Sequence, residues 1–149
     1  MIGLLQRVTH ASVDVEGERI ATIDHGLLVL VGVQRNDGEH ELERLLERLL
    51  GYRVFPDQQG RMNRDVRQVA GGLLLVPQFT LAADTRSGTR PGFSTAAEPH
   101  EGRRLFELLV KRARALHDPV AAGRFGADMQ VALVNDGPVT FSLEVPPAR

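Results

Sequence analysis

Hydrophobic and polar positions along the chain follow two periods, which predict strands in some segments and helices in others. Residues 12–16 alternate between polar and apolar, and residues 18–23 follow across a glycine turn, so this stretch predicts a hairpin. Residues 27–33 form an unbroken apolar run, typical of a strand covered on both faces, and we expect that strand to be central. The runs 52–55 and 73–76 predict two further strands.

Two amphipathic helices are expected between the strands. Leucines at helical spacing within residues 42–50 predict the first helix, with Asn36 or Asp37 as its cap and Gly51 as its stop.

Thr95 and Glu98 have the spacing of a capping box, so the second helix should begin there. Its apolar face extends over residues 105–116, and it should end near His117. Residues 61–70 carry no decisive pattern.

The C-terminal third predicts more strands. Residues 129–134 and residues 139–145 read as separate strands, followed by a tail at 146–149 that we expect to be loose. About seven strands with two helices among them favour one α/β domain over residues 1–149, with mixed, partly barrel-like β-sheets covered by the two helices.

Composition narrows the chemistry. The chain has 149 residues, of which 42% are hydrophobic and 25% charged, and it contains no cysteine. This excludes disulfides and thiolate chemistry, and the scattered histidines give no support for a metal site, so we expect no metal and no cofactor. No apolar run approaches the length of a membrane span and no secretory signal is recognisable, so we expect a cytoplasmic protein without membrane contact.

Charge gives only local signals. The net charge of −1 lacks the strongly basic balance of many nucleic-acid-binding proteins. Basic residues nevertheless cluster in the loop after residue 82 and on the second helix, where the simplest interpretation is a solvated surface. They are Arg86, Arg90, Arg103, Arg104, Lys111, Arg112 and Arg114.

The segment after the strand at 73–76 is the first candidate site. Gln78, Phe79 and Thr80 present an amide, a ring and a hydroxyl in succession. A threonine without an activating base is a poor nucleophile, and Thr80 equally fits an ordinary strand end. Backbone N–H groups at these three residues are better suited to the chemistry, because fixed donors stabilise a developing oxyanion.

The second candidate is Gly137-Pro138, which interrupts two apolar strands with a backbone that few other residues adopt. Most Gly-Pro pairs are ordinary turns, and that interpretation also fits. The usual serine-hydrolase, nucleotide-binding and zinc-protease motifs are absent from the sequence.

At these residues the chain closely resembles the D-aminoacyl-tRNA deacylase family. The resemblance implies a cytoplasmic homodimer that hydrolyses the ester at the aminoacylated 3′ end of tRNA, releasing a D-amino acid. The segments that carry it are QRV (6–8), GLLVLVGV (26–33), QFTL (78–81), ADTR (83–86), GRFGADMQV (123–131) and NDGPVT (135–140).

The resemblance also assigns roles. Gly137-Pro138 corresponds to the Gly-cis-Pro motif, which one subunit inserts into the other's pocket so that an L side chain finds no room. Many D-amino acids, and also glycine, should then be accepted. Gln78, Phe79 and Thr80 should lie at the scissile carbonyl, where the substrate's own ribose hydroxyl activates water.

Three further residues match the family's pocket. Arg7 is expected to hold the Gly-Pro loop, and Phe125 and Met129 to line the pocket. A salt bridge for Arg7 and core packing for the other two are equally compatible with the sequence.

One departure from the family affects the site. The family usually has serine where this chain has Pro77, and proline removes both a hydroxyl and an N–H. This substitution keeps an alternative open, a non-catalytic dimeric module that binds tRNA or a D-amino acid.

Overall fold

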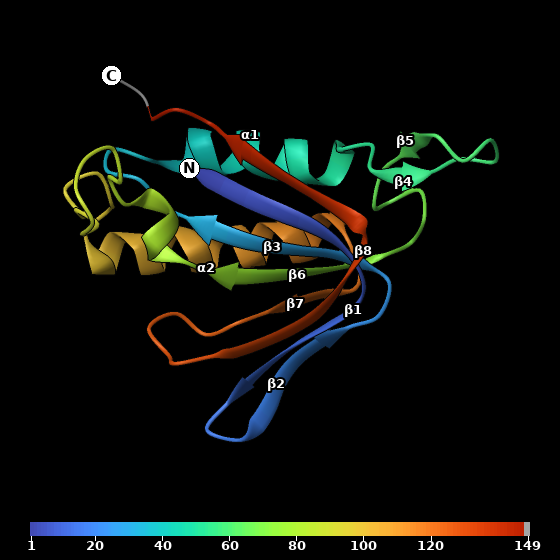
Figure 1. The fold of residues 1–149 in the computed structure, drawn as a ribbon, viewed down its shortest axis with the longest axis horizontal. Helices are drawn as coiled ribbons and strands as arrows, with labels where there is room; N and C mark the ends of the chain where they lie inside the picture. Colours follow the sequence, from blue (N-terminus) through green and yellow to red (C-terminus); the bar gives the residue numbers. More distant parts are fainter. Residues whose placement is uncertain (148–149) are drawn as a thin grey trace.

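The protein, described over residues 1–147 in a computed structural model, folds around a curved mixed sheet with the helices on one side (Figure 1). Its elements in chain order are β1 (Ile2–Val15), β2 (Glu18–Ile23), β3 (Gly26–Gly32), α1 (Glu39–Gly51), β4 (Phe55–Pro56), β5 (Met62–Arg64), β6 (Gly72–Pro77), the 3₁₀ turn η1 (Phe79–Ala82), α2 (Pro99–Leu116), β7 (Val120–Ala122) and β8 (Gln130–Glu144).

The large sheet has the strand order β2-β1-β3-β6-β7, and β8 pairs with β1. The β3-β6 and β6-β7 pairs are parallel, whereas β1 pairs antiparallel with β2, β3 and β8. Ile20 of β2 and Ala122 of β7 line one cavity, so the two edges of the sheet curl toward each other. The expected α/β fold with a partly barrel-like sheet and two helices is confirmed.

Strands β3 and β6 are apolar throughout because both of their faces are buried. Leu73 and Leu75 of β6 belong to the core that α1 and α2 cover, together with Leu27 and Val29 of β3. Leu74 and the other alternate residues of β6 belong to a second core inside the curl of the sheet. Successive side chains point to opposite faces of a strand, so two cores require the unbroken run seen in the sequence.

The structure differs from the expected strands in two places. Residues 52–54 do not form a strand, since the Val54 carbonyl accepts a hydrogen bond from Arg7, and pairing begins only at Phe55. The two strands expected at 129–134 and 139–145 are one strand, β8, which follows β1 through two register shifts. The three-residue β7 is too short to produce a pattern and was not expected.

The helix caps also differ. The N-cap of α1 is Gly38, not Asn36 or Asp37, and its N–H donates to the Glu41 carboxylate at 2.8 Å. The expected capping box of α2 is absent, because the Thr95 hydroxyl donates to the Ala82 carbonyl instead. Of the tail expected at 146–149, residues 148–149 lie outside the described residues, and its looseness stays a prediction.

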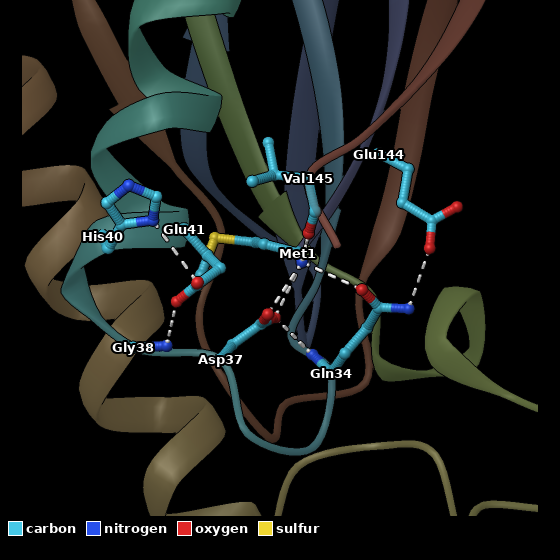
Figure 2. Close-up of polar contacts among 8 residues, drawn as sticks. All are labelled: Met1, Gln34, Asp37, Gly38, His40, Glu41, Glu144 and Val145. Atoms are coloured by element: carbon cyan, nitrogen blue, oxygen red, sulfur yellow. Dashed lines mark hydrogen bonds and ion pairs between the residues drawn. The ribbon is translucent and has the colours of Figure 1, made fainter. Parts of the chain in front are cut away.

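The Met1 ammonium group links the start of the chain to the loop before α1 and to the residue that follows β8 (Figure 2). It donates to the carboxylate of Asp37 and to Gln34 Oε1, both at 2.9 Å, and to the Val145 carbonyl at 2.6 Å. The Met1 and Asp37 side chains are 0% exposed. Burial raises the pKa of Asp37, against the opposing effect of the ammonium and of the Gln34 N–H.

Replacement of Asp37 by Asn should lower the free energy of unfolding by about 3 kcal/mol, because it leaves the buried ammonium without its counter-charge. Urea unfolding with an unchanged m value measures this. Asp24→Asn, at an exposed position, is the matched control. Equal stability of the two variants would show that the buried ion pair contributes nothing.

Candidate functional site

The chain leaves the sheet at the end of β6. Pro77 pairs in register with Val31, and the N–H of Gln78 donates to the Val31 carbonyl at 2.8 Å. The chain then turns into η1. Thr80 therefore lies in a 3₁₀ turn and not at the strand end that the sequence suggested.

Two backbone N–H groups at this turn have no hydrogen-bond acceptor among the described residues. The first N–H groups of a helix have no acceptor within the helix. Within residues 1–147, the N–H groups of Phe79 and Thr80 have no recorded hydrogen-bond acceptor. The sequence predicted three donors here, but the Gln78 N–H is used by Val31, so the available pair is Phe79 and Thr80.

The side chains at the turn supply no base. In the described part of the chain, the only recorded partner of the Thr80 hydroxyl is the side-chain amide of Gln78. The Phe79 ring is 59% exposed and packs on Phe93 at a centroid distance of 5.3 Å. The turn thus offers N–H donors, a neutral hydroxyl and an apolar ring.

The loop that carries Phe93 is closed by backbone pairing between Asp84 and Gly92, and a local ion pair lies beside it. Asp84 forms backbone hydrogen bonds with Gly92 in both directions, and its carboxylate accepts from the Arg86 side chain at 2.8 and 2.9 Å. The Arg86 side chain and backbone N–H lower the pKa of Asp84 to about 2. This carboxylate is therefore ionised near neutral pH, and its contact with Arg86 weakens only as the pH falls toward 2.

Met129 lies beside the end of β6. A Cβ built on Gly123 would be 2.8 Å from Met129 Sδ and 3.3 Å from Pro77 Cδ, so Gly123 sits between the two. Phe125 instead lies against α2, where the Arg103 guanidinium is 5.1 Å from its ring centroid. Of these two residues, Met129 is thus the one that lies near Pro77, across Gly123.

The Gly137-Pro138 segment forms a loop within β8. Its peptide bond is cis. The pairing of β8 with β1 passes from Asn135 directly to Thr140, so the residues between them are outside the ladder. Gly137 has φ 132°, and a Cβ there would lie 2.7 Å from Val139 Cγ2, which restricts the position to glycine.

Two side chains fix this loop. Arg7 donates to the Asp136 carbonyl at 3.1 Å and to the Val54 carbonyl at 2.7 Å, and it also lies 3.4 Å from the Asp136 carboxylate. Asn135 accepts from the Val139 N–H at 3.0 Å and donates to the Thr140 hydroxyl at 2.8 Å. Sequence analysis did not single out Asn135, although an amide and a hydroxyl flanking Gly-Pro were a usable signal.

The two candidate segments are far apart within one chain. Pro77 is in register with Gly3 through β3, whereas the Gly-Pro loop lies opposite Arg7. Four residues along β1 and three strand spacings across the sheet separate them by on the order of 20 Å. Figure 1 shows the bend of β8 and the end of β6 at opposite ends of the sheet. One chain therefore does not join them into one pocket.

Comparison with known proteins assigns the chain to a family. Residues 4–144 match the family described as D-Tyr-tRNA(Tyr) deacylase. The D-aminoacyl-tRNA deacylase of Thioalkalivibrio sulfidiphilus is 62% identical over 149 residues, covering 100% of both chains. That of Stutzerimonas stutzeri is 62% identical over 144 residues, covering 97% of this chain and 99% of the relative.

A solved structure is also similar over nearly the full length. The structure described as c-Myc DNA Unwinding Element Binding Protein has 38% sequence identity and a TM-score of 0.94, covering 98% of this chain and 99% of that chain. The folds of the two proteins therefore agree over nearly the whole of this chain.

Replacement of Arg7 by Lys should accelerate amide hydrogen exchange at Val139 by about tenfold, because a single ammonium does not reproduce the two carbonyl contacts of the guanidinium. Arg48→Lys is the matched control, since Arg48 donates to the Glu144 carbonyl elsewhere on β8. Unchanged exchange at Val139 would show that Arg7 does not hold the loop.

Proposed function

The chain belongs to the D-Tyr-tRNA(Tyr) deacylase family, and we propose that it hydrolyses the ester between a D-amino acid and the terminal ribose of tRNA at the end of β6. It is a hydrolase, as are its named deacylase relatives. We propose this location because the N–H groups of Phe79 and Thr80 have no hydrogen-bond acceptor among the described residues. The cytoplasm is the proposed compartment, where aminoacylated tRNA is used.

The proposed chemical step uses backbone and substrate groups. Water adds to the ester carbonyl, and the Phe79 and Thr80 N–H groups stabilise the oxyanion that forms. The substrate's vicinal ribose hydroxyl relays the water proton to the leaving ribose oxygen as the ester bond breaks. This route suits a turn in which Thr80 contacts only the neutral Gln78 amide.

Selection between D and L esters is proposed for the Gly137-Pro138 loop. Gly137 and Pro138 lie outside the β ladder, and their two carbonyl oxygens are proposed to accept hydrogen bonds from the substrate's α-ammonium group. A substrate held in this way has no volume where an L side chain would project. Glycine has no side chain to exclude, so a glycyl ester should also be accepted.

We propose that the active unit is a homodimer. The loop and the β6 end are on the order of 20 Å apart in one chain, so a second copy has to bring its loop to this chain's turn. Strand β8 pairs only on its β1 side among the described strands, and it exposes Val134 and Phe141 at 46% and 37%. Exposed apolar residues on an unpaired strand suit a contact between copies.

Three further residues complete the proposed pocket. Arg7 positions the loop through its contacts with Asp136 and Val54. Met129 borders the β6 end beside Pro77, and Phe125 extends the apolar lining toward α2.

A second candidate is a non-catalytic nucleic-acid-binding module. Pro77 lacks the hydroxyl usual at this position, and the similar structure at 38% identity carries a DNA-element-binding description. Stoichiometric tRNA binding without ester turnover would favour this candidate over the enzyme.

Purified protein should release D-tyrosine from D-tyrosyl-tRNA at least 100-fold faster than L-tyrosine from the L ester, on the order of a 3 kcal/mol discrimination. Thr80→Ala should keep at least about a tenth of kcat, because the backbone donors remain. Incorporation of the α-hydroxy analogue of Thr80 deletes only the N–H and should lower kcat about 10²- to 10³-fold. The reverse order of these two losses would assign the chemistry to the hydroxyl.

Mixing two inactive variants tests the shared site. Gly137→Val disables the loop, and the α-hydroxy analogue at Thr80 disables the turn. Refolded together, half of the dimers are mixed and each has one intact combination, so about a quarter of the wild-type activity should return. No recovery, with mixed dimers shown by mass spectrometry, would place both segments of one site in the same chain.

A further inference from the structure

The five basic residues of α2 divide into two groups. Arg104 pairs with Glu101, and Arg112 pairs with Glu39 and Glu43. Within residues 1–147, the other three have no recorded carboxylate partner: Arg103, Lys111 and Arg114. The neighbouring Arg124 is exposed and likewise has no recorded ion pair.

The unpaired cations line one continuous groove between α2 and β7. Lys111 and Arg114 line a cavity of about 480 Å³, and Arg103 and Arg124 line an adjoining cavity of about 330 Å³. The two cavities share four lining residues, so they form one groove, which we call the α2-β7 groove: Phe106, Glu107, Ala122 and Gly123. Four cations thus face a single carboxylate, that of Glu107, in a chain whose net charge is −1.

The groove passes beside the end of β6. Gly123 belongs to both cavities, its N–H donates to the Leu75 carbonyl at 2.8 Å, and the space for its absent Cβ is 3.3 Å from Pro77 Cδ. Pro77 directly precedes Gln78. The groove therefore passes close to the segment that leads into the turn at Phe79 and Thr80.

Length and lining both suit a single nucleic-acid strand. Residues 103 to 114 span about 16 Å of helix, which is roughly the rise of five nucleotides along one strand. Phe106 and Val110 give the groove an apolar floor, and the Arg103 guanidinium lies over the Phe125 ring. Cations above aromatic and apolar surface are the usual features of a single-strand binding groove.

We propose that the α2-β7 groove binds the phosphates of the single-stranded 3′ end of the substrate tRNA and guides its terminal ester to the turn at Phe79 and Thr80. The proposal rests on the proposed function. It assigns affinity for the tRNA to Lys111 and Arg114, which lie away from the reacting atoms.

Binding of uncharged tRNA tests the groove without hydrolysis. The double variant Lys111→Gln/Arg114→Gln should raise Kd about tenfold and reduce the slope of log Kd against log salt by about 1.4, or 0.7 for each phosphate contact. Arg104→Gln is the matched control, because it removes a cation of the same helix that is already paired with Glu101. An unchanged salt slope, or an equal loss for Arg104→Gln, would overturn the proposal.

Hydrolysis of two different ester substrates tests the role of the groove separately from the proposed catalytic activity. D-tyrosyl-tRNA carries phosphates that reach the groove, whereas the D-tyrosyl ester of adenosine does not. The double variant should raise KM about tenfold for the tRNA ester only, and equal losses on both substrates would overturn the groove. If the wild-type protein cleaves neither ester, the proposed function fails, while the tRNA-binding measurement still decides the groove.

Discussion

The hydrogen bond from the Gln78 N–H to the Val31 carbonyl is the interaction on which the candidate site depends. It is the last bond between β6 and β3, whereas the neighbouring Pro77 faces β7 and has no N–H to donate on that side. The chain turns directly after this bond, and a tight turn leaves its first two amides without acceptors. Both strands are buried on two faces, so this end of the sheet is as rigid as the core behind it.

The Gly-Pro loop is held by a different kind of constraint. Its residues leave the β ladder, and side chains replace the lost backbone bonds: Arg7 satisfies two carbonyls and Asn135 bridges the base of the loop. These contacts hold the backbone of the loop in one orientation. In the proposed homodimer, this backbone would lie opposite the turn of a second copy, which is a physical basis for recognising the handedness of a small substrate without reading its side chain.

Ion pairs neutralise some of the basic residues of α2 and leave others without a carboxylate partner among the described residues. The chain as a whole is slightly acidic, yet α2 carries cations on two of its sides. Glutamates of α1 and α2 neutralise one set, and the set facing β7 has no such partners among the described residues. A nearly neutral protein can in this way keep a locally positive groove beside its proposed catalytic turn, which limits nonspecific attraction to nucleic acid elsewhere on its surface.

The sequence by itself determined both helices and the central strands, because periodicity is a local signal, and glycine-proline and strand-end patterns selected the two candidate segments. It misplaced the helix caps, since Asp37 and Thr95 bond to residues outside the helices, and it split β8, since pairing with β1 continues on both sides of the Gly-Pro loop. Only the tertiary structure decided which amides and which cations remain unpaired and that the two segments lie at opposite ends of one chain. Each of those properties depends on strand register and on contacts between distant residues, which no local pattern encodes.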